Sequence, residues 1–177
     1  MNIKIDKVIA EHLLKWHYES NLDFIKLLNF INDNSIPIVN SRLTSALGMA
    51  TYYKIHLDII NIESKPIMLR YFIILHEIAH YKRLIKKGLD YHLHFLSSNN
   101  VNNLYNHLLN EEIIADNYAS YVFNKLNDIK YPYEMTQQLK EYENKIKFIN
   151  TAYSLMGKLN NTEESYKNMI STYIIND

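Results

Sequence analysis

The sequence predicts a mainly α-helical fold with a small β-sheet, of the α+β class, in a single domain. Most of the chain falls into segments whose apolar residues recur every three or four positions, which is the spacing of one helix face. Between residues 36 and 60, one short segment is mostly apolar and another alternates apolar with polar residues, which is typical of strands. The chain has 177 residues without a repeat, linker or low-complexity block, so one domain accounts for 1–177.

Composition narrows the class of protein. Hydrophobic residues make up 47% of the chain and charged residues 21%, which suits a folded domain with a sizeable core. Lys+Arg and Asp+Glu number 19 each, so no net charge favours nucleic acid or an anionic membrane. There are no cysteines, which leaves histidines and carboxylates as the candidate metal ligands. The chain shows no secretory signal, and its longest apolar run, residues 71–75, is too short to span a membrane. We therefore expect a cytoplasmic protein without membrane or nucleic-acid partners.

The N-terminal third predicts two helices followed by two strands. Helical spacing of apolar residues places the first helix over about 4–18 and the second from Phe24 to the polar stretch 32–35. The segment 36–39 predicts a short strand, and its proline favours an edge position. Alternation over 50–60 predicts a longer strand with one buried and one solvent-exposed face, and the glycine just before it suggests a turn or bulge.

A long helix follows. Ser64 and Pro66 form a helix start, a capping hydroxyl followed by proline in the first turn, and the helix should end near Lys87, before Gly88. We expect a core over about 36–127, with N-terminal helices within 4–34 and C-terminal helices within 134–174 packing on it. The remaining predicted elements are a polar loop at 97–103, a helix over 107–127, a hinge at 131–133, a helix over 134–158 and a short helix after Asn161.

The predicted third helix carries the motif HEIAH at residues 76–80. Residues four apart differ by about 40° and rise about 6 Å, so His76 and His80 project toward a common point. Two imidazoles at that spacing can bind Zn²⁺ with bonds of about 2.0–2.1 Å. Glu77 is not needed as a ligand; it can take a proton from a zinc-bound water and pass it to a leaving amine. The alternative is a pair of surface histidines on a helix.

Two candidates compete for the third ligand. Glu112 lies four residues before Asp116 on one predicted helix, so one carboxylate could bind zinc while the other accepts the spare N–H of a ligating histidine. An amphipathic helix with an acidic first turn would show the same residues. The second candidate is the pair His92 and His94, which would otherwise belong to a solvated loop after the third helix.

The run from the predicted strands through HEIAH to the sequence EIIADNYA at residues 112–119 resembles the gluzincin metallopeptidases, especially the small ImmA/IrrE-like group. The resemblance covers roughly residues 36–125 and implies a zincin-like domain. It also implies that His76, His80 and Glu112 bind zinc, that Glu77 is the base, and that Asp116 supports a ligand. The implied activity is a zinc endopeptidase that cleaves a protein partner, often a repressor, in bacteria or their phages.

The sequence also departs from that group. Ala79 stands where glycine is usual, and residues 121–124 continue the helix where proline commonly ends it. A SprT-like peptidase, with His92 or His94 as third ligand, is the alternative within the zinc peptidases. Outside them, the alternatives are a catalytically silent zincin-fold binding or structural protein of a phage or mobile element, and a DNA-binding regulator, which the balanced charge disfavours.

The predicted strand over 50–60 suggests how a substrate could bind. A free strand edge can accept an extended peptide as an additional strand, which lets a peptidase contact the main chain of its substrate. An ordinary sheet edge would show the same sequence.

Overall fold

The computed structural model describes residues 5–44, 46–97, 100–129 and 162–175, and it confirms the predicted combination of many helices with a small sheet. The helices of the described residues are α1 (Lys7–Glu19), α2 (Phe24–Asp33), α3 (Ile59–Glu63), α4 (Ile67–Lys87), α5 (Leu89–Leu96), α6 (Val101–Asn127) and α8 (Glu163–Ser171). The strands are β1 (Ile38–Asn40), β2 (Arg42–Leu43), β3 (Gly48–Ala50), β4 (Ile55–Leu57) and β5 (Ile174–Ile175).

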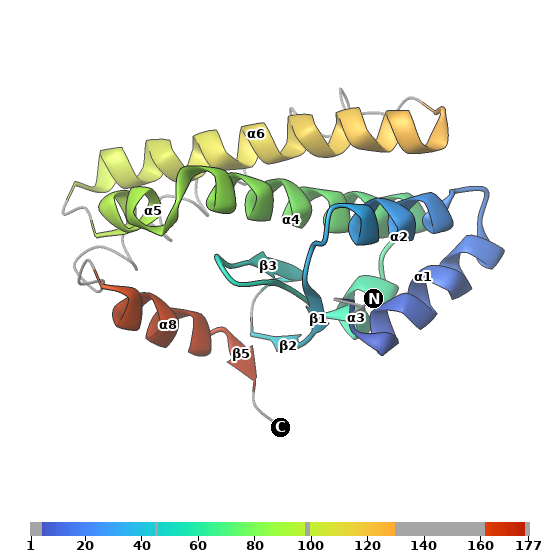
Figure 1. Cartoon of the computed structure of the whole chain (residues 1–177), viewed down its shortest axis with the longest axis horizontal. Helices are drawn as coiled ribbons and strands as arrows, with labels where there is room; N and C mark the ends of the chain where they lie inside the picture. The colour runs from blue at the N-terminus through green and yellow to red at the C-terminus, as the bar shows by residue number, and fades with distance from the viewer. Residues whose placement is uncertain (1–4, 45, 98–99, 130–161, 176–177) are drawn as a thin grey trace.

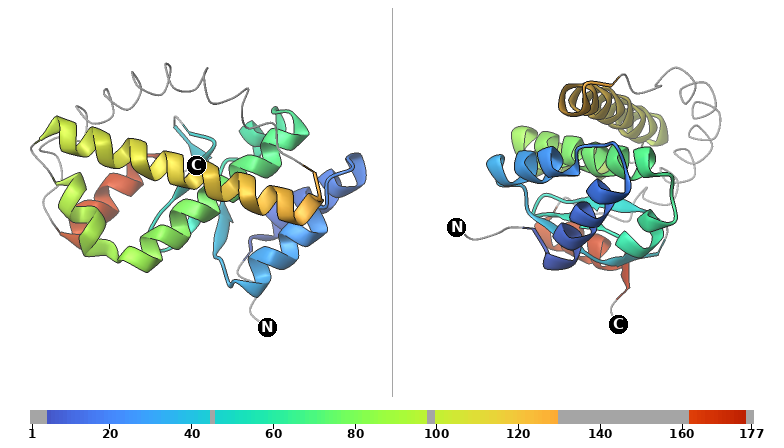
Figure 2. Two further views of the ribbon diagram at one scale, coloured as in Figure 1. Left: turned by 90° about the horizontal axis from the view of Figure 1, so that it is seen from above. Right: turned by 90° about the vertical axis from the view of Figure 1, so that its right-hand side faces the viewer.

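The long helices α4 and α6 pack together above the sheet (Figure 1). Seen from above, α6 crosses α4 obliquely, so the two helices are in contact over part of their length (Figure 2). Helices α1 and α2 lie at one end of α4, and α5 folds back at its other end (Figure 1). Among the described helices, none combines the length and apolar composition that a membrane span requires.

The main sheet has the strand order β1-β4-β3, with β4 in the centre. β1 pairs with β4 in parallel and β3 pairs with β4 antiparallel, so the backbone reverses between β3 and β4. The predicted edge position of the first strand is confirmed, and an isolated bridge from Ile5 to Ile38 is added outside it. The other edge of the sheet is β3, on the side of α4 that carries the histidine motif.

The prediction of one strand over 50–60 with a solvent-exposed face is wrong. The chain leaves β3 at Ala50 and turns, because Thr51 binds the carbonyl of Lys54 through both its N–H and its hydroxyl. It then forms β4, and α3 begins at Ile59. Alternation failed as a guide here because β4 is the central strand and all three of its residues are buried.

The polar residues of this segment are buried with partners. The hydroxyl of Ser41 lies 2.9 Å from His56 Nδ1. The carboxylate of Asp58 accepts hydrogen bonds from the backbone N–H groups of Leu43 and Asn61, the second of which caps α3. Because side chains and backbone satisfy them internally, His56 and Asp58 do not need a face in water.

Several helix boundaries differ from prediction. α4 begins after Pro66 and ends before Gly88 (φ 84°) as expected, but Ser64 is not its cap, because the Ser64 hydroxyl donates to the carbonyl of Asn61 at the end of α3. α6 begins at Val101 rather than 107, because the Asn100 side chain accepts from the first N–H groups of the helix. Residues expected as a loop after Gly88 form α5. The expected hinge at 131–133 and helix over 134–158 lie outside the described residues, whereas α8 confirms the short helix after Asn161.

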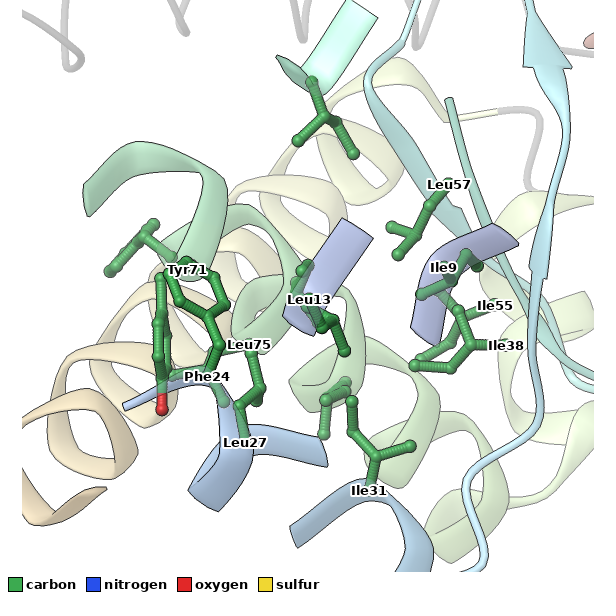
Figure 3. Close-up of a cluster of buried hydrophobic side chains, with 14 of the residues drawn as sticks. Ile9, Leu13, Phe24, Leu27, Ile31, Ile38, Ile55, Leu57, Tyr71 and Leu75 are labelled. Atoms are coloured by element: carbon green, nitrogen blue, oxygen red, sulfur yellow. The ribbon is translucent and has the colours of Figure 1, made fainter. Parts of the chain in front are cut away.

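The largest buried cluster of the described residues lies between α1, α2, α3, the sheet, α4 and the C-terminal half of α6, and Figure 3 shows part of it. Each such side chain contributes roughly 1.5–3 kcal/mol relative to an exposed one. The cluster fixes α4 against the sheet and thereby sets the position of everything on the second half of that helix. Ten of its fully buried members are Ile9, Leu13, Phe24, Leu27, Ile31, Ile38, Ile55, Leu57, Tyr71 and Leu75.

The segment 162–175 lies against the β3–β4 hairpin and α5. The hydroxyl of Tyr166, on α8, accepts a hydrogen bond from the backbone N–H of Tyr52 in the hairpin turn. Tyr166 and Ile170 form a small apolar cluster with Leu93 of α5 and with Met49 of β3. β5 then pairs antiparallel with β2, the strand that precedes the hairpin in the chain (Figure 1).

The buried His56 should make the fold sensitive to mild acid. Burial lowers the pKa of His56 from 6.5 to about 4, and the nearby Lys54 adds to the effect. Between these two pH values, His56 binds a proton in the unfolded chain but not in the folded one. The folded state is therefore destabilised as the pH drops from 6.5 toward 4, and His56 accounts for a loss of about 2 to 3 kcal/mol in the free energy of unfolding. Urea unfolding of metal-free protein at several pH values should show this loss.

The variant His56→Gln can still hydrogen-bond to Ser41 and should reduce the pH dependence over that window by about half, because the buried His92, whose pKa is also lowered to about 4, contributes to the same dependence. The matched control is His94→Gln, because His94 is exposed and its replacement should leave the wild-type slope. Equal slopes for wild type and His56→Gln would contradict the assignment.

Candidate metal centre

The two histidines of the HEIAH motif lie on α4 and face α6. Their Nε2 atoms are 3.0 Å apart, and each side chain is less than one-fifth exposed. The spacing of four residues produces this pairing, as the sequence predicted. The rotation of α4 about its axis is fixed at this point, because Ile74, Leu75 and Ile78 on its other face are buried in the core.

Glu112 on α6 completes a group of three. Its Oε2 lies 3.2 Å from His76 Nε2, and its Oε1 lies 3.3 Å from His80 Nε2. Among the described residues, this is the one set of three or more His, Asp or Glu side chains whose ligand atoms all lie within 4.8 Å of one another. The predicted site residues are therefore brought together from helices about thirty residues apart in sequence.

The donor set fits a zinc ion. Ligand atoms at about 2.0–2.1 Å in a tetrahedral arrangement are about 3.3 Å from one another. The distances of 3.0, 3.2 and 3.3 Å within the group are close to this value. Two imidazole nitrogens and one carboxylate are also a ligand set of catalytic zinc sites, which keep a fourth position for water or substrate.

Asp116 supports His76 from the opposite side of its ring. His76 Nδ1–H donates to Asp116 Oδ1 over 2.8 Å, which leaves Nε2 as the ring nitrogen that faces Glu112 and His80 and would bind a metal. Asp116 lies one helical turn after Glu112, so α6 supplies both carboxylates. Ala115 and Ala119 on the same helix are buried, and their small side chains allow α6 to approach α4 closely.

The group favours a bound cation. Burial alone would lower the pKa of His76, but hydrogen bonds to Asp116 and Glu112 raise the pKa to about 10. For Glu112, burial would raise the pKa, and the hydrogen bonds of His76 and His80 instead hold it well below its usual range. The carboxylates thus stabilise positive charge between the rings. A metal ion competes with protons for that place, so zinc affinity should fall in acid.

Glu77 lies outside this ligand group. Its side chain is buried and receives a hydrogen bond from the backbone N–H of Ala50 on β3. Burial raises the pKa of Glu77, and the charges of His80 and His76 oppose that rise. The carboxylate is therefore near the metal ligands in space while its hydrogen bond goes to the sheet.

An ion pair that sequence analysis missed lies next to the group. Arg83 donates to Glu111 through Nε (2.5 Å) and Nη2 (2.6 Å), a two-point contact between α4 and α6. Arg83 follows His80 by three residues, and Glu111 directly precedes Glu112. No spacing rule links a basic and an acidic residue on separate helices, so the sequence carried no signal for the pair.

His92 and His94 do not join the group. His92 lies on α5 with its ring 5.8 Å from that of His107, and its Nε2 is buried without a hydrogen-bond partner among the described residues. Burial lowers the pKa of His92 to about 4, while Glu111 opposes the shift. His94 is exposed on the same helix. The geometry therefore favours Glu112 over either histidine as third ligand.

We expect one zinc ion per chain, held by Glu112 together with the two histidines. Glu112→Ala should weaken zinc binding by about two or more orders of magnitude, because it removes one of three protein ligands. The double variant His92→Ala/His94→Ala should bind zinc as the wild type does. Competition with a chromophoric chelator and elemental analysis measure both quantities.

Two results would count against this ligand set. One is a wild type that retains less than about one-fifth of an equivalent of zinc and is not restored by dialysis against zinc. The other is loss of zinc in the double histidine variant with retention in Glu112→Ala, which would instead indicate the SprT-like arrangement.

Comparison of the chain with protein-family models, with curated proteins and with solved structures gives no match. What the centre can do therefore follows from its own side chains and their arrangement.

Proposed function

We propose that the protein is a zinc-dependent endopeptidase with a zincin-like fold. The observation that carries this proposal is the convergence of His76, His80 and Glu112, with Asp116 behind one ligand and Glu77 beside the group. The arrangement of an HExxH helix, a second helix with the acidic ligand and a small sheet beside them is also what the resemblance to the ImmA/IrrE-like group implies.

A zinc ion at this site would supply a Lewis acid that polarises a water molecule and the carbonyl group of a peptide. In this proposal Glu77 would accept a proton from that water and return it to the leaving amine. His76 keeps its ring orientation through Asp116 during these steps.

The substrate we propose is an extended segment of a protein partner, such as a repressor or regulator. β3 is an edge strand, and its residue Ala50 contacts Glu77. A peptide added along this edge would run past the base and next to the metal ligands, which suits cleavage within a chain. We propose the cytoplasm as the location, since a chain without cysteines suits a reducing compartment.

The exchange Glu77→Gln separates the base from the ligands. It keeps the size and hydrogen-bonding shape of the side chain but cannot accept the proton. We expect zinc content and melting temperature close to wild type, and a loss of cleavage of about 10²–10⁴-fold. Cleavage is measured by mass spectrometry on unfolded casein and on a panel of proteins, with and without a zinc chelator.

The control is Glu11→Gln, because Glu11 lies on α1 with a side chain that is 62% exposed. This variant should cleave as the wild type does. Loss of zinc from Glu77→Gln would assign Glu77 a structural role. A wild type that binds zinc but cleaves nothing would instead support a catalytically silent binding or structural protein of this fold.

A further inference from the structure

Gly48 lies in direct contact with Glu77. A Cβ atom added at residue 48 would lie 2.5 Å from Cγ of Glu77, 2.9 Å from Cδ and 3.0 Å from Oε1. Contacts below about 3 Å do not occur for real Cβ atoms, so any larger residue at 48 requires the Glu77 side chain to move. The strand and the proposed base are fitted to each other at this point.

The backbone conformation does not explain the glycine. Among the described glycines, only Gly88 has a positive φ, so residue 48 adopts a conformation open to alanine. The limiting factor at residue 48 is the space that Glu77 occupies. The sequence-based expectation that this glycine marks a turn or bulge was wrong, since it lies within β3.

A second contact comes from the same strand. Ala50 donates its backbone N–H to the Glu77 carboxylate. Residues two apart in a strand present equivalent groups to the same side. The side chain of Glu77 is therefore packed against the strand at residue 48 and hydrogen-bonded to it at residue 50, while it stays buried.

Glu77 has little freedom to yield. The closest atom is Cγ, which lies in the middle of the side chain rather than at its flexible end. The neighbouring groups of Glu77 include His76, His80 and Glu112 on one side and β3 on the other. A rotation that relieves the contact must carry the carboxylate away from its place beside the ligands, and displacement by about 1 Å can cost about 10²-fold in rate.

We propose that Gly48 is a positioning residue for Glu77: the missing side chain at 48 and the N–H of Ala50 set where the carboxylate of the base lies. The proposal rests on the proposed function in assigning Glu77 as the base. It adds that β3 determines the efficiency of that base, whereas the metal is held by α4 and α6. A change in β3 should therefore impair catalysis and leave the metal in place.

The test compares Gly48→Ala with Gly88→Ala, Glu77→Gln and the wild type, all as full-length chains. Gly88→Ala is the matched control, because it introduces strain at a positive φ but its added Cβ meets no atom within 4 Å. We expect Gly48→Ala to bind one zinc ion with near wild-type affinity and to lose about 10²-fold in kcat on casein with little change in KM. Gly88→Ala should lose thermal stability and keep its kcat.

Cobalt(II) provides a readout that needs no substrate. The visible spectrum of Co²⁺ bound at the centre, followed against pH, reports the charge environment beside the metal. We expect the midpoint for Gly48→Ala to move in the same direction as that for Glu77→Gln, by about half a pH unit or more, while Gly88→Ala matches the wild type.

The outcomes separate the two proposals. If Gly48→Ala matches the wild type in kcat and in the cobalt profile, the positioning role is overturned and the proposed function stands. If the wild type binds cobalt but cleaves nothing, the endopeptidase proposal fails, and the cobalt profiles alone decide whether Gly48 places Glu77. A wild type that binds neither zinc nor cobalt overturns both.

Discussion

Two ionic contacts join α4 to α6 on either side of Glu112, one from His76 to Asp116 and one from Arg83 to Glu111. They fix the rotation and the register of the two helices, since a slip of one residue would separate both pairs. The position of Glu112 between His76 and His80 depends on that register. The small buried residues of α6 permit the close approach, and the ionic contacts then select one alignment of the helices.

This alignment brings several charged groups together, which by itself lowers the stability of the fold. Glu112 and Asp116 lie beside two imidazoles in a partly buried place, where unpaired charges are unfavourable. The core around the first half of α4 offsets that cost, because it buries many large hydrophobic side chains (Figure 3). One helix thus has two functions on two faces. One face packs into the core through Ile74, Leu75 and Ile78, while the other presents His76 and His80 to Glu112, a group that gains most when a cation is present.

Much of the helical architecture could be predicted from the sequence, because helix periodicity and the HEIAH spacing are local. The pairing of Glu112 with the histidines is a contact between distant segments, and the predictive signal for it was the resemblance to a family. The strand over 50–60 was predicted wrongly because alternation cannot distinguish a half-exposed strand from a buried central strand followed by a cap. Contacts such as Arg83 with Glu111, and Gly48 with Glu77, have no sequence signature, since they depend on how helices and strands pack.

The segment 162–175 has a consequence for the order of events during synthesis. Tyr166 supports the hairpin turn at Tyr52, and β5 pairs with β2. A ribosome makes this segment after every residue of the metal centre, so the histidines and Glu112 can meet before the hairpin has its last support. The hairpin beside Glu77 therefore gains its contacts with Tyr166 and with the β2–β5 pair only after the residues of the candidate metal centre have been made.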